Sequence, residues 1–270
     1  MKLWVLGSGS RGNAVLVQSG ETRVLIDVGF GPRILKKRLD AIGVAPESID
    51  ACVITHEHSD HIRGAARAAR RWSWPLLLTE GTYANSRLAV LGTSAGKFHA
   101  GATLDFADMT VETFRTPHDA TEPIGVVVTA RASGVRAAIC TDIGHASRSV
   151  HRMVQDVDML IIESNHDDVM LANGPYPLFL QRRIASSVGH LSNRECGALV
   201  RDSISGRLKQ VVLAHLSENN NTPRAAYDSM RVAIKGTTFR GALIPALQDG
   251  VIGPFAPRAT KSDVQLSLGF

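Results

Sequence analysis

The chain has few cysteines and no long apolar segment, and each shortage argues against a class of protein. Its 270 residues include three cysteines, Cys52, Cys140 and Cys196, which are far apart and form no Cys-x-x-Cys pair. An odd, scattered set of this kind argues against a disulfide framework and against a thiolate zinc site. No apolar run approaches the roughly 20 residues that a membrane-spanning helix needs. We therefore expect a cytoplasmic protein that makes no membrane contact.

What the chain does contain is enough apolar sequence for a full core. Hydrophobic residues make up 44% of it, which suits one large domain. From residue 253 the sequence becomes polar and aperiodic and contains two prolines, so we expect a hydrolase domain over residues 1–252 and a flexible tail over 253–270. The net charge of +5 permits a polyanionic partner without requiring one.

Short β-rich runs alternate with helical patterns along the chain. This rhythm suits two stacked sheets with helices outside. The expected strands are 3–6, 14–18, 23–26, 51–54, 75–78, 110–114, 124–131, 136–140, 159–162, 210–214 and 239–244. The expected helices are 32–42, 62–72, 146–154, 178–187, 194–203 and 223–234.

The most informative segment is Thr55-His56-Glu57-His58-Ser59-Asp60-His61, which follows an apolar run. Imidazole and carboxylate are ligands that zinc, manganese and iron accept. On a loop that leaves a strand, His56 and His58 would face one ion, and Asp60 and His61 another. A histidine-rich surface turn is the alternative.

Later strands end in further ligands. His118, Asp142 and His215 each follow an apolar run that reads as a strand, and Asp142 is placed to bridge two ions. A two-metal hydrolytic site needs several such ligands around a shared oxygen. Each histidine alone could be an ordinary buried residue; together with the cluster they favour a metal site.

These residues, in this order, resemble the metallo-β-lactamase superfamily over residues 1 to about 250. The resemblance implies an α/β (α+β) fold, a four-layer αββα sandwich, with two divalent metal ions, zinc first and manganese or iron as alternatives. It assigns His56, His58 and His118 to one ion, Asp60, His61 and His215 to the other, and makes Asp142 the bridge. Asp27, in an early Asp-Val-Gly turn, would hydrogen-bond the metal loop and fix its shape.

Further motifs resemble one subgroup, the YycJ or WalJ type, whose relatives include RNase Z enzymes. They are the stretches at 7–13, 162–167, 173–177, 189–193 and 215–221. The resemblance implies a nuclease or phosphodiesterase. Substrate contacts are then expected at Ser10, Asn13, Arg182, Arg183 and Asn193. The glycine-rich loop 7–13 either presents N–H groups to a phosphate or is a tight turn.

His190 precedes a Ser-x-x-Glu capping box that begins at Ser192. Free N–H groups at such a helix start favour anions. His190 would protonate a leaving alkoxide and Glu163 would orient its ring, by similarity to the RNase Z pair, while Asp60 would orient or deprotonate the attacking water. The alternative is that His190 only packs against the turn.

The arginines have two interpretations. Arg63, Arg67, Arg70 and Arg71 follow the histidine cluster. They, like Arg182 and Arg183, are either solvated helix faces or phosphate contacts.

The chain ends in Gln265-Leu266-Ser267-Leu268-Gly269-Phe270. This resembles the hexapeptide by which bacterial polymerases and repair proteins bind the sliding clamp. Gln265, Leu266, Leu268 and Phe270 would make the contacts, in the manner of a short peptide in an apolar groove. An apolar end that folds back on the domain is the alternative.

The first hypothesis is therefore a two-metal DNA exonuclease of repair or replication, with DNA favoured over RNA by the clamp motif. The second is a small-molecule hydrolase of the same fold, such as a thioesterase, a lactonase or a cyclic-phosphate diesterase. A binding protein with a degenerate site is disfavoured, because every expected ligand position is filled.

Overall fold

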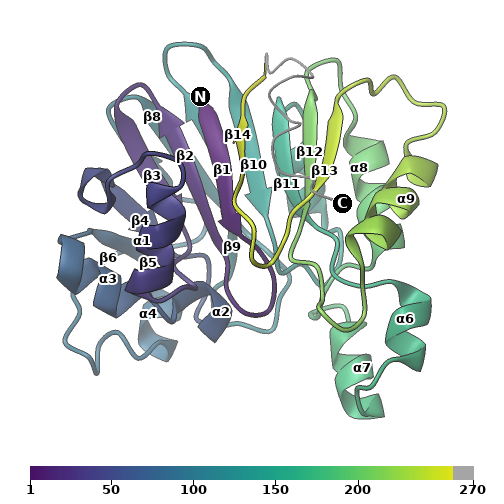
Figure 1. The fold of residues 1–270 in the computed structure, drawn as a ribbon, viewed down its shortest axis with the longest axis horizontal. Coiled ribbons are helices and arrows are strands. Elements are labelled where there is room, and N and C mark those ends of the chain that lie inside the picture. The colour runs from purple at the N-terminus through teal and green to yellow at the C-terminus, as the bar shows by residue number, and fades with distance from the viewer. Residues whose placement is uncertain (258–270) are drawn as a thin grey trace.

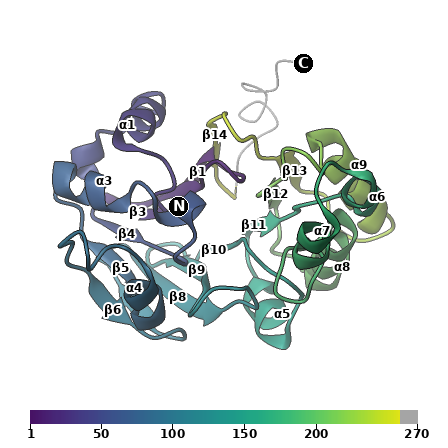
Figure 2. The ribbon, with the colours of Figure 1, turned by 90° about the horizontal axis from the view of Figure 1, so that it is seen from below.

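Two seven-stranded sheets lie face to face in the structure, a computed structural model that describes residues 1–257 (Figures 1 and 2). The first sheet has the order β14-β1-β2-β3-β4-β5-β6 and the second β13-β12-β11-β10-β9-β8-β7. The strands of the first sheet are β1 (Lys2–Gly7), β2 (Ala14–Ser19), β3 (Thr22–Ile26), β4 (Ala51–Val53), β5 (Leu76–Thr79), β6 (Gly96–Phe98) and β14 (Ile252–Phe255). Those of the second are β7 (Thr103–Asp105), β8 (Met109–Arg115), β9 (Ile124–Ala130), β10 (Arg136–Cys140), β11 (Met159–Glu163), β12 (Gln210–Ala214) and β13 (Ala242–Pro245).

Both sheets combine antiparallel and parallel pairing. Strands β3 to β6 of the first sheet are parallel, as are β10 to β13 of the second. The parallel strands are reached through helical crossovers, whereas β1-β2-β3 and β7-β8-β9-β10 form antiparallel meanders. The carboxyl ends of several strands are thereby brought to one edge of the sandwich.

Helices cover the outer face of each sheet (Figure 2). The helices are α1 (Pro32–Asp40), α2 (Ser59–Ile62), α3 (Ala65–Trp72), α4 (Glu80–Asn85), α5 (Arg148–Val154), α6 (Asp168–Asn173), α7 (Leu178–Ile184), α8 (Asn193–Ser203) and α9 (Pro223–Ala233), with a short 3-10 turn at Pro46–Ser48. The helices α1 and α3 share a hydrophobic cluster with the first sheet, and α5, α8 and α9 share another with the second.

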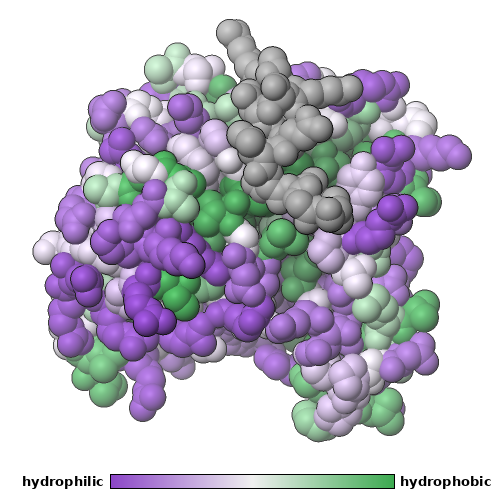
Figure 3. Space-filling view, viewed as in Figure 1, coloured by the Kyte–Doolittle hydropathy of each residue, from purple (hydrophilic) through white to green (hydrophobic). Residues whose placement is uncertain are grey.

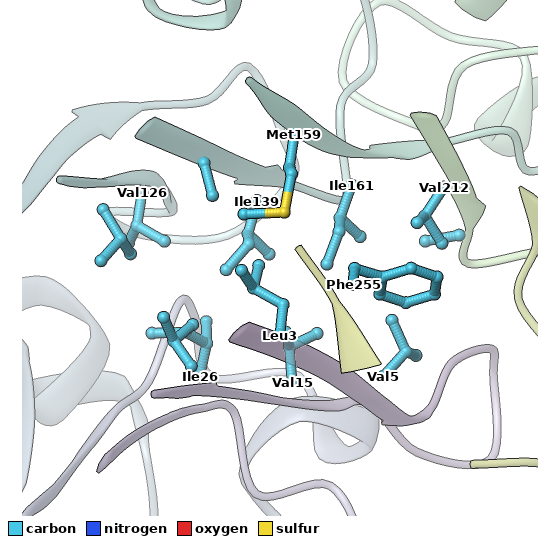
Figure 4. Packing of buried hydrophobic residues seen from close by; sticks show 14 of the residues in the cluster. Leu3, Val5, Val15, Ile26, Val126, Ile139, Met159, Ile161, Val212 and Phe255 are labelled. Atoms are coloured by element: carbon cyan, nitrogen blue, oxygen red, sulfur yellow. The ribbon is translucent and has the colours of Figure 1, made fainter. Parts of the chain in front are cut away.

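Strand β1 shows why the sheets are buried on both faces. Leu3 and Val5 point into the core between the sheets, and Trp4 and Leu6 point to the cluster under α1 and α3. Alternation of side chains along a strand sends neighbours to opposite faces, so a continuous apolar run fits a strand covered on both sides. Figure 4 shows the inter-sheet core, where Met159 and Ile161 of β11 face Leu3.

The expected fold class, an αββα sandwich, is confirmed, and most expected elements are present. The structure adds three short strands, β6, β7 and β14, and two short helices, α4 and α6. It also divides the expected helix 62–72 at Gly64, whose N–H donates outside the helix, to the Val28 carbonyl. Only glycine fits there, since a β-carbon would stand 1.9 Å from the Phe30 carbonyl oxygen.

The expected boundary between domain and tail falls inside β14. This strand pairs with β1, Leu3 opposite Phe255, and Phe255 is buried in the inter-sheet core. The folded unit therefore extends at least to Phe255. Among residues 1–257, no helix has the length and apolar character to cross a bilayer.

Candidate metal centre

The expected metal ligands lie together at the edge where the strands end. His56 and His58 follow β4, and α2, at the lower edge of the sandwich in Figure 1, carries Asp60 and His61. The ligands from the second sheet each follow a strand: His118 after β8, Asp142 after β10 and His215 after β12. The site is therefore built from both sheets.

Two three-residue ligand sets form at this edge. Ligand atoms of His56, His58 and His118 all lie within 4.8 Å of one another, as do those of Asp60, His61 and His215. In the first set, His118 Nε2 is 3.2 Å from His58 Nδ1. In the second, His215 Nε2 is 3.2 Å from Asp60 Oδ2.

Asp142 lies between the two sets. Its Oδ2 is 3.1 Å from His61 Nε2, in the second set, and its Oδ1 is 3.7 Å from His118 Nε2, in the first. Burial alone would raise the pKa of the Asp142 carboxyl, but His215 and His61 hold it well below its ordinary value. An ionised carboxylate with one oxygen toward each set has the placement of a bridging ligand.

The ligand histidines have their other ring nitrogens engaged. His61 Nδ1 lies 2.7 Å from Asp27 Oδ2, His118 Nδ1 lies 3.0 Å from the Gly189 carbonyl, and His215 Nδ1 lies 2.8 Å from Glu163 Oε1. Each acceptor favours a proton on Nδ1, so Nε2 is the nitrogen that a metal ion would bind. Metal-bound histidines characteristically have such partners, which fix the tautomer and the ring orientation.

The donor set fits divalent metal ions on a second ground. Among the described residues, the buried atoms His56 Nε2 and Asp142 Oδ2 have no hydrogen-bond partner. A buried polar atom without a partner costs roughly 1–3 kcal/mol. Burial also lowers the pKa of His56 well below its ordinary value, which keeps the imidazole neutral. A cation that accepts nitrogen and oxygen ligands would satisfy both atoms.

Three site residues have left-handed backbone conformations. Their φ angles are 64° at Asp27, 59° at Asp142 and 54° at His215. Residues other than glycine rarely adopt such angles, which cost about 1–3 kcal/mol each and concentrate at functional sites. The backbone is therefore strained at the site residues that follow β3, β10 and β12.

Asp27 braces the metal loop, as expected. Its carboxylate accepts hydrogen bonds from the Thr55 N–H at 2.8 Å and from the Thr55 hydroxyl, besides its contact with His61. The side chain is buried. One carboxylate therefore fixes both the start of the loop and the ring of a ligand.

His190 and Glu163 form a second buried arrangement beside the ligands. His190 Nδ1 and His215 Nδ1 are each 2.8 Å from the same oxygen, Glu163 Oε1. Burial would raise the pKa of Glu163, but His190 and His215 lower it to about 2. For His190, burial lowers the pKa but the Glu163 carboxylate outweighs it, so the pKa is raised. Glu163 is thus an ionised acceptor shared by the expected metal ligand His215 and by His190, which lines the cavity.

The expected capping box is also present. The Ser192 hydroxyl accepts from the Glu195 N–H, and the Glu195 carboxylate accepts from the Ser192 N–H, at the start of α8. The His190 N–H donates to the Ile184 carbonyl, so the end of α7 fixes the His190 backbone.

A cavity of about 310 Å³ opens over the ligands. The residues that line it are Ser10, His58, Ser59, Asp60, Asp142, Asn165, Tyr176, Arg183, Ile184, His190, His215 and Ser217. Of the expected substrate contacts, Ser10 and Arg183 are therefore at the cavity. Arg183 is held by Asp119, which follows the ligand His118, at 2.6 Å.

The substrate role expected for Asn13 and Asn193 needs correction, because both are buried and neither lines the cavity. Arg182 does not line the cavity either, and its contact with substrate stays a prediction. Asn13 is buried, and its amide nitrogen lies 3.1 Å from Asp60 Oδ2 and 3.0 Å from His61 Nε2. Asn193 is buried too, and its side-chain amide oxygen accepts from the Ser164 hydroxyl. Both brace the interior, whereas Arg182 is exposed on α7.

The loop 7–13 is a tight turn and does not offer a ring of free N–H groups. The Gly9 N–H donates to the Asn13 side chain, the Gly12 N–H to the Gly9 carbonyl, and the Arg11 N–H to Gln248. A phosphate would have to displace these bonds.

Sequence reasoning missed Asp119 and Tyr176 as residues of the site. Asp119 directly follows His118, and this adjacency was the available signal. Tyr176 lies in the 173–177 motif, but nothing in that motif shows that its side chain reaches the cavity. The clamp-motif residues Gln265, Leu266, Leu268 and Phe270 lie outside the described residues.

Comparison with known proteins agrees with this geometry. A sequence profile of the metallo-beta-lactamase superfamily matches residues 7–149. The exodeoxyribonuclease WalJ of Streptococcus pneumoniae serotype 2 is 34% identical over 234 residues, which are 85% of this chain and 86% of the relative. The chain belongs to the metallo-β-lactamase superfamily.

Two further proteins are similar. The exodeoxyribonuclease YycJ of Bacillus anthracis is 32% identical over 239 residues, 87% of this chain and 89% of the relative. The crystal structure of the metallo-beta-lactamase fold protein YhfI from Bacillus subtilis superposes with a TM-score of 0.68 at 19% identity. It covers 93% of this chain and 98% of that one, and at this identity the likeness shows the metallo-β-lactamase fold alone.

Proposed function

We propose that this protein is a metal-dependent nuclease that hydrolyses phosphodiester bonds in DNA as an exonuclease. The observation that carries the proposal is the placement of His190, held by Glu163, in the same cavity as both ligand sets. Hydrolysis of a phosphodiester releases an alkoxide as the leaving group. This alkoxide needs a proton, which a histidine beside the site can supply. The similarity to exodeoxyribonucleases over most of the chain supports the choice of DNA.

The ions proposed are two divalent cations, zinc first, with manganese or iron as alternatives. His56, His58 and His118 would hold one, Asp60, His61 and His215 the other, and Asp142 would lie between them. When bound, such ions supply an activated water and positive charge at the phosphate.

The protein's own groups then position and move protons. The Nδ1–H group of His190 donates to Glu163, so His190 can hold a second proton on Nε2 and give it to the leaving oxygen. Asp60 lines the cavity, and His215 and Asn13 both contact its Oδ2. We assign its carboxylate to orienting the attacking water and accepting its proton.

The test compares the metal-loaded protein with labelled duplex DNA, single strands, RNA and a panel of thioesters and lactones. Release of mononucleotides from DNA ends is expected. Hydrolysis confined to the thioesters or lactones would overturn the proposal in favour of a small-molecule hydrolase. Cleavage of RNA alone would overturn the choice of DNA.

A matched pair of variants tests the role of His190. His190→Ala is expected to keep its metal content and to lose about 10²–10⁴-fold in kcat, the usual contribution of a general acid. His99→Ala is the control, because His99 also pairs with a glutamate, Glu122, at 3.3 Å, but is exposed and lies away from the cavity. Loss of metal from His190→Ala would make His190 a ligand instead.

The C-terminal motif supports a further part of the proposal, recruitment to the bacterial sliding clamp during DNA repair or replication in the cytoplasm. A peptide of residues 260–270 should bind a purified clamp, and a peptide with Leu268 and Phe270 changed to alanine should not. Equal binding of the two peptides, or none, would remove the clamp from the proposal.

A further inference from the structure

Four arginines lie exposed on one side of the metal centre, and we call Arg33, Arg63, Arg67 and Arg71 the basic patch. Arg33 belongs to α1, Arg63 follows α2, and Arg67 and Arg71 stand one turn apart on α3. Figure 3 shows hydrophilic atoms gathered over the part of the molecule that α1 and α3 occupy in Figure 1.

The packing of α3 turns its arginines outward. Its buried residues are three alanines and Trp72, which belong to the hydrophobic cluster between the helices and the outer face of the first sheet. Small side chains on the inner face let the helix lie close to the sheet, and the arginines occupy the opposite face. Arg67 and Arg71 are consequently about 6 Å apart along the helix axis.

The basic patch adjoins the cavity through Arg63. Its guanidinium donates to the backbone carbonyls of Arg11 and Gly29. Arg11 follows Ser10, which lines the cavity, and Arg63 itself comes two residues after the ligand His61. The positive charge therefore begins at the rim of the metal centre.

Arg67 joins the two helices of the basic patch. Its guanidinium lies 3.7 Å from the position that a β-carbon on Gly31 would occupy, at the residue before α1. Arg33 is in the first turn of α1. Arg67 of α3 therefore lies beside the start of α1, the turn that carries Arg33.

Within residues 1–257, no member of the basic patch forms an ion pair with a carboxylate, although nearby basic residues do. Lys36 pairs with Asp40, and Arg38 with Asp249. Neither α1 nor α3 has an acidic residue in its first turn, where an acid would offset the positive end of the helix dipole. Uncompensated cations repel one another, and a polyanion relieves that repulsion.

We infer that the basic patch binds the phosphate backbone of the DNA beyond the bond that is cut, so the preferred substrate is a polynucleotide and not a mononucleotide ester. This inference rests on the proposed nuclease function. Arginine to phosphate contacts position a nucleic acid without reading its sequence, and the binding they give weakens as salt displaces it.

The test measures kcat/KM of the metal-loaded protein on a duplex of about 40 base pairs, from about 50 to about 200 mM KCl. Each arginine to phosphate contact contributes about 0.9 to the slope of log affinity against log salt. Arg67→Gln/Arg71→Gln should therefore flatten the slope by about 1.8. The ratio of kcat/KM of the unmodified protein to that of the variant should therefore fall about 12-fold over this fourfold salt range. The loss should appear in KM and not in kcat.

Two further variants sharpen the test. Arg67→Lys/Arg71→Lys keeps the charge and should retain most of the slope. Arg152→Gln/Arg201→Gln removes the same charge from exposed positions on α5 and α8, over the outer face of the other sheet, and should keep the original slope. Melting temperature and metal content check that each variant is folded.

The outcomes distinguish a failure of the DNA-binding role of the basic patch from a failure of the proposed nuclease function. If the unmodified protein cleaves DNA and the glutamine variant keeps its slope and KM, the basic patch is not a DNA-binding surface and the nuclease proposal stands. An equal loss in the α5 and α8 control would reduce the effect to net charge and also overturn the inference. If no DNA is cleaved at any salt concentration, the proposed function fails and this inference with it.

Discussion

Changing Asp27 to asparagine should weaken metal binding at one site while leaving the other site in place. Asparagine is nearly the same size and tolerates the left-handed backbone of residue 27, so the variant changes the carboxylate and little else. The carboxylate accepts from the Thr55 N–H through Oδ1 and from His61 Nδ1 through Oδ2. An amide can accept with only one of its two ends.

If the amide oxygen stays with Thr55, the amide N–H group faces His61 Nδ1. His61 must then move its proton to Nε2, the nitrogen that lies 3.1 Å from Asp142 Oδ2. A protonated Nε2 cannot bind a metal ion. Loss of a partner of this kind weakens metal binding about 10–100-fold, or about 1.4–2.7 kcal/mol.

Calorimetric titration of the metal-free protein with Zn²⁺ would measure this change. We expect one of two binding events to weaken by that factor, and the event at His56, His58 and His118 to change little. Asp50→Asn is the control, because Asp50 also accepts a backbone N–H, from Arg23 at 2.7 Å, on the protein surface. Two binding events with unchanged affinities in a folded Asp27→Asn variant, as judged by circular dichroism, would refute the reasoning.

Three further predictions concern stability. Gly29→Ala should lower the free energy of unfolding in urea by about 1–3 kcal/mol or more, because its β-carbon would stand 1.8 Å from the Asp60 carbonyl oxygen. Gly206→Ala is the control and should change stability by less than about 0.5 kcal/mol, because nothing lies within 4 Å of its β-carbon. Equal effects of the two variants would contradict this prediction. The pKa of Asp108 is lowered from 3.8 by hydrogen bonds from the Thr22 hydroxyl and N–H and from the Glu21 N–H. Its contribution to stability is therefore present above pH 3.8 and is lost as the pH falls through the lower folded-state value, so unfolding curves of the protein and of Asp108→Asn should differ at neutral pH and converge in acid. Removing bound metal with a chelator should lower the melting temperature by roughly 5–10 °C for each ion that was present at about 100 times its Kd. An unchanged melting temperature would argue against a structural contribution from the ions.

The ligand positions could be predicted because the sequence marks them in a simple way. Each ligand segment follows a short apolar run, and strand ends converge at one edge of a sandwich whatever the details of the packing. The capping box at Ser192 was equally readable, since it depends on two residues in one turn.

Side-chain direction could not be read in the same way. Asn13 and Asn193 stand beside the site in sequence, but both turn inward to satisfy buried polar groups. Strands β6 and β7 were missed because they are three residues long and partly exposed, with little apolar pattern. The strand β14 was missed because its glycine and proline, at 253 and 254, are typical of a loop.

The pairing of β14 with β1 has a practical consequence for shortening the chain. β14 is the outermost strand of the first sheet, so a chain that ended at residue 252 would leave the backbone groups of β1 without their neighbour. It would also remove Phe255 from the space between the sheets and expose part of a hydrophobic surface. An unpaired, apolar edge strand invites pairing between molecules. A truncation designed from the sequence alone should therefore aggregate, whereas one that ends at residue 257 should stay monodisperse.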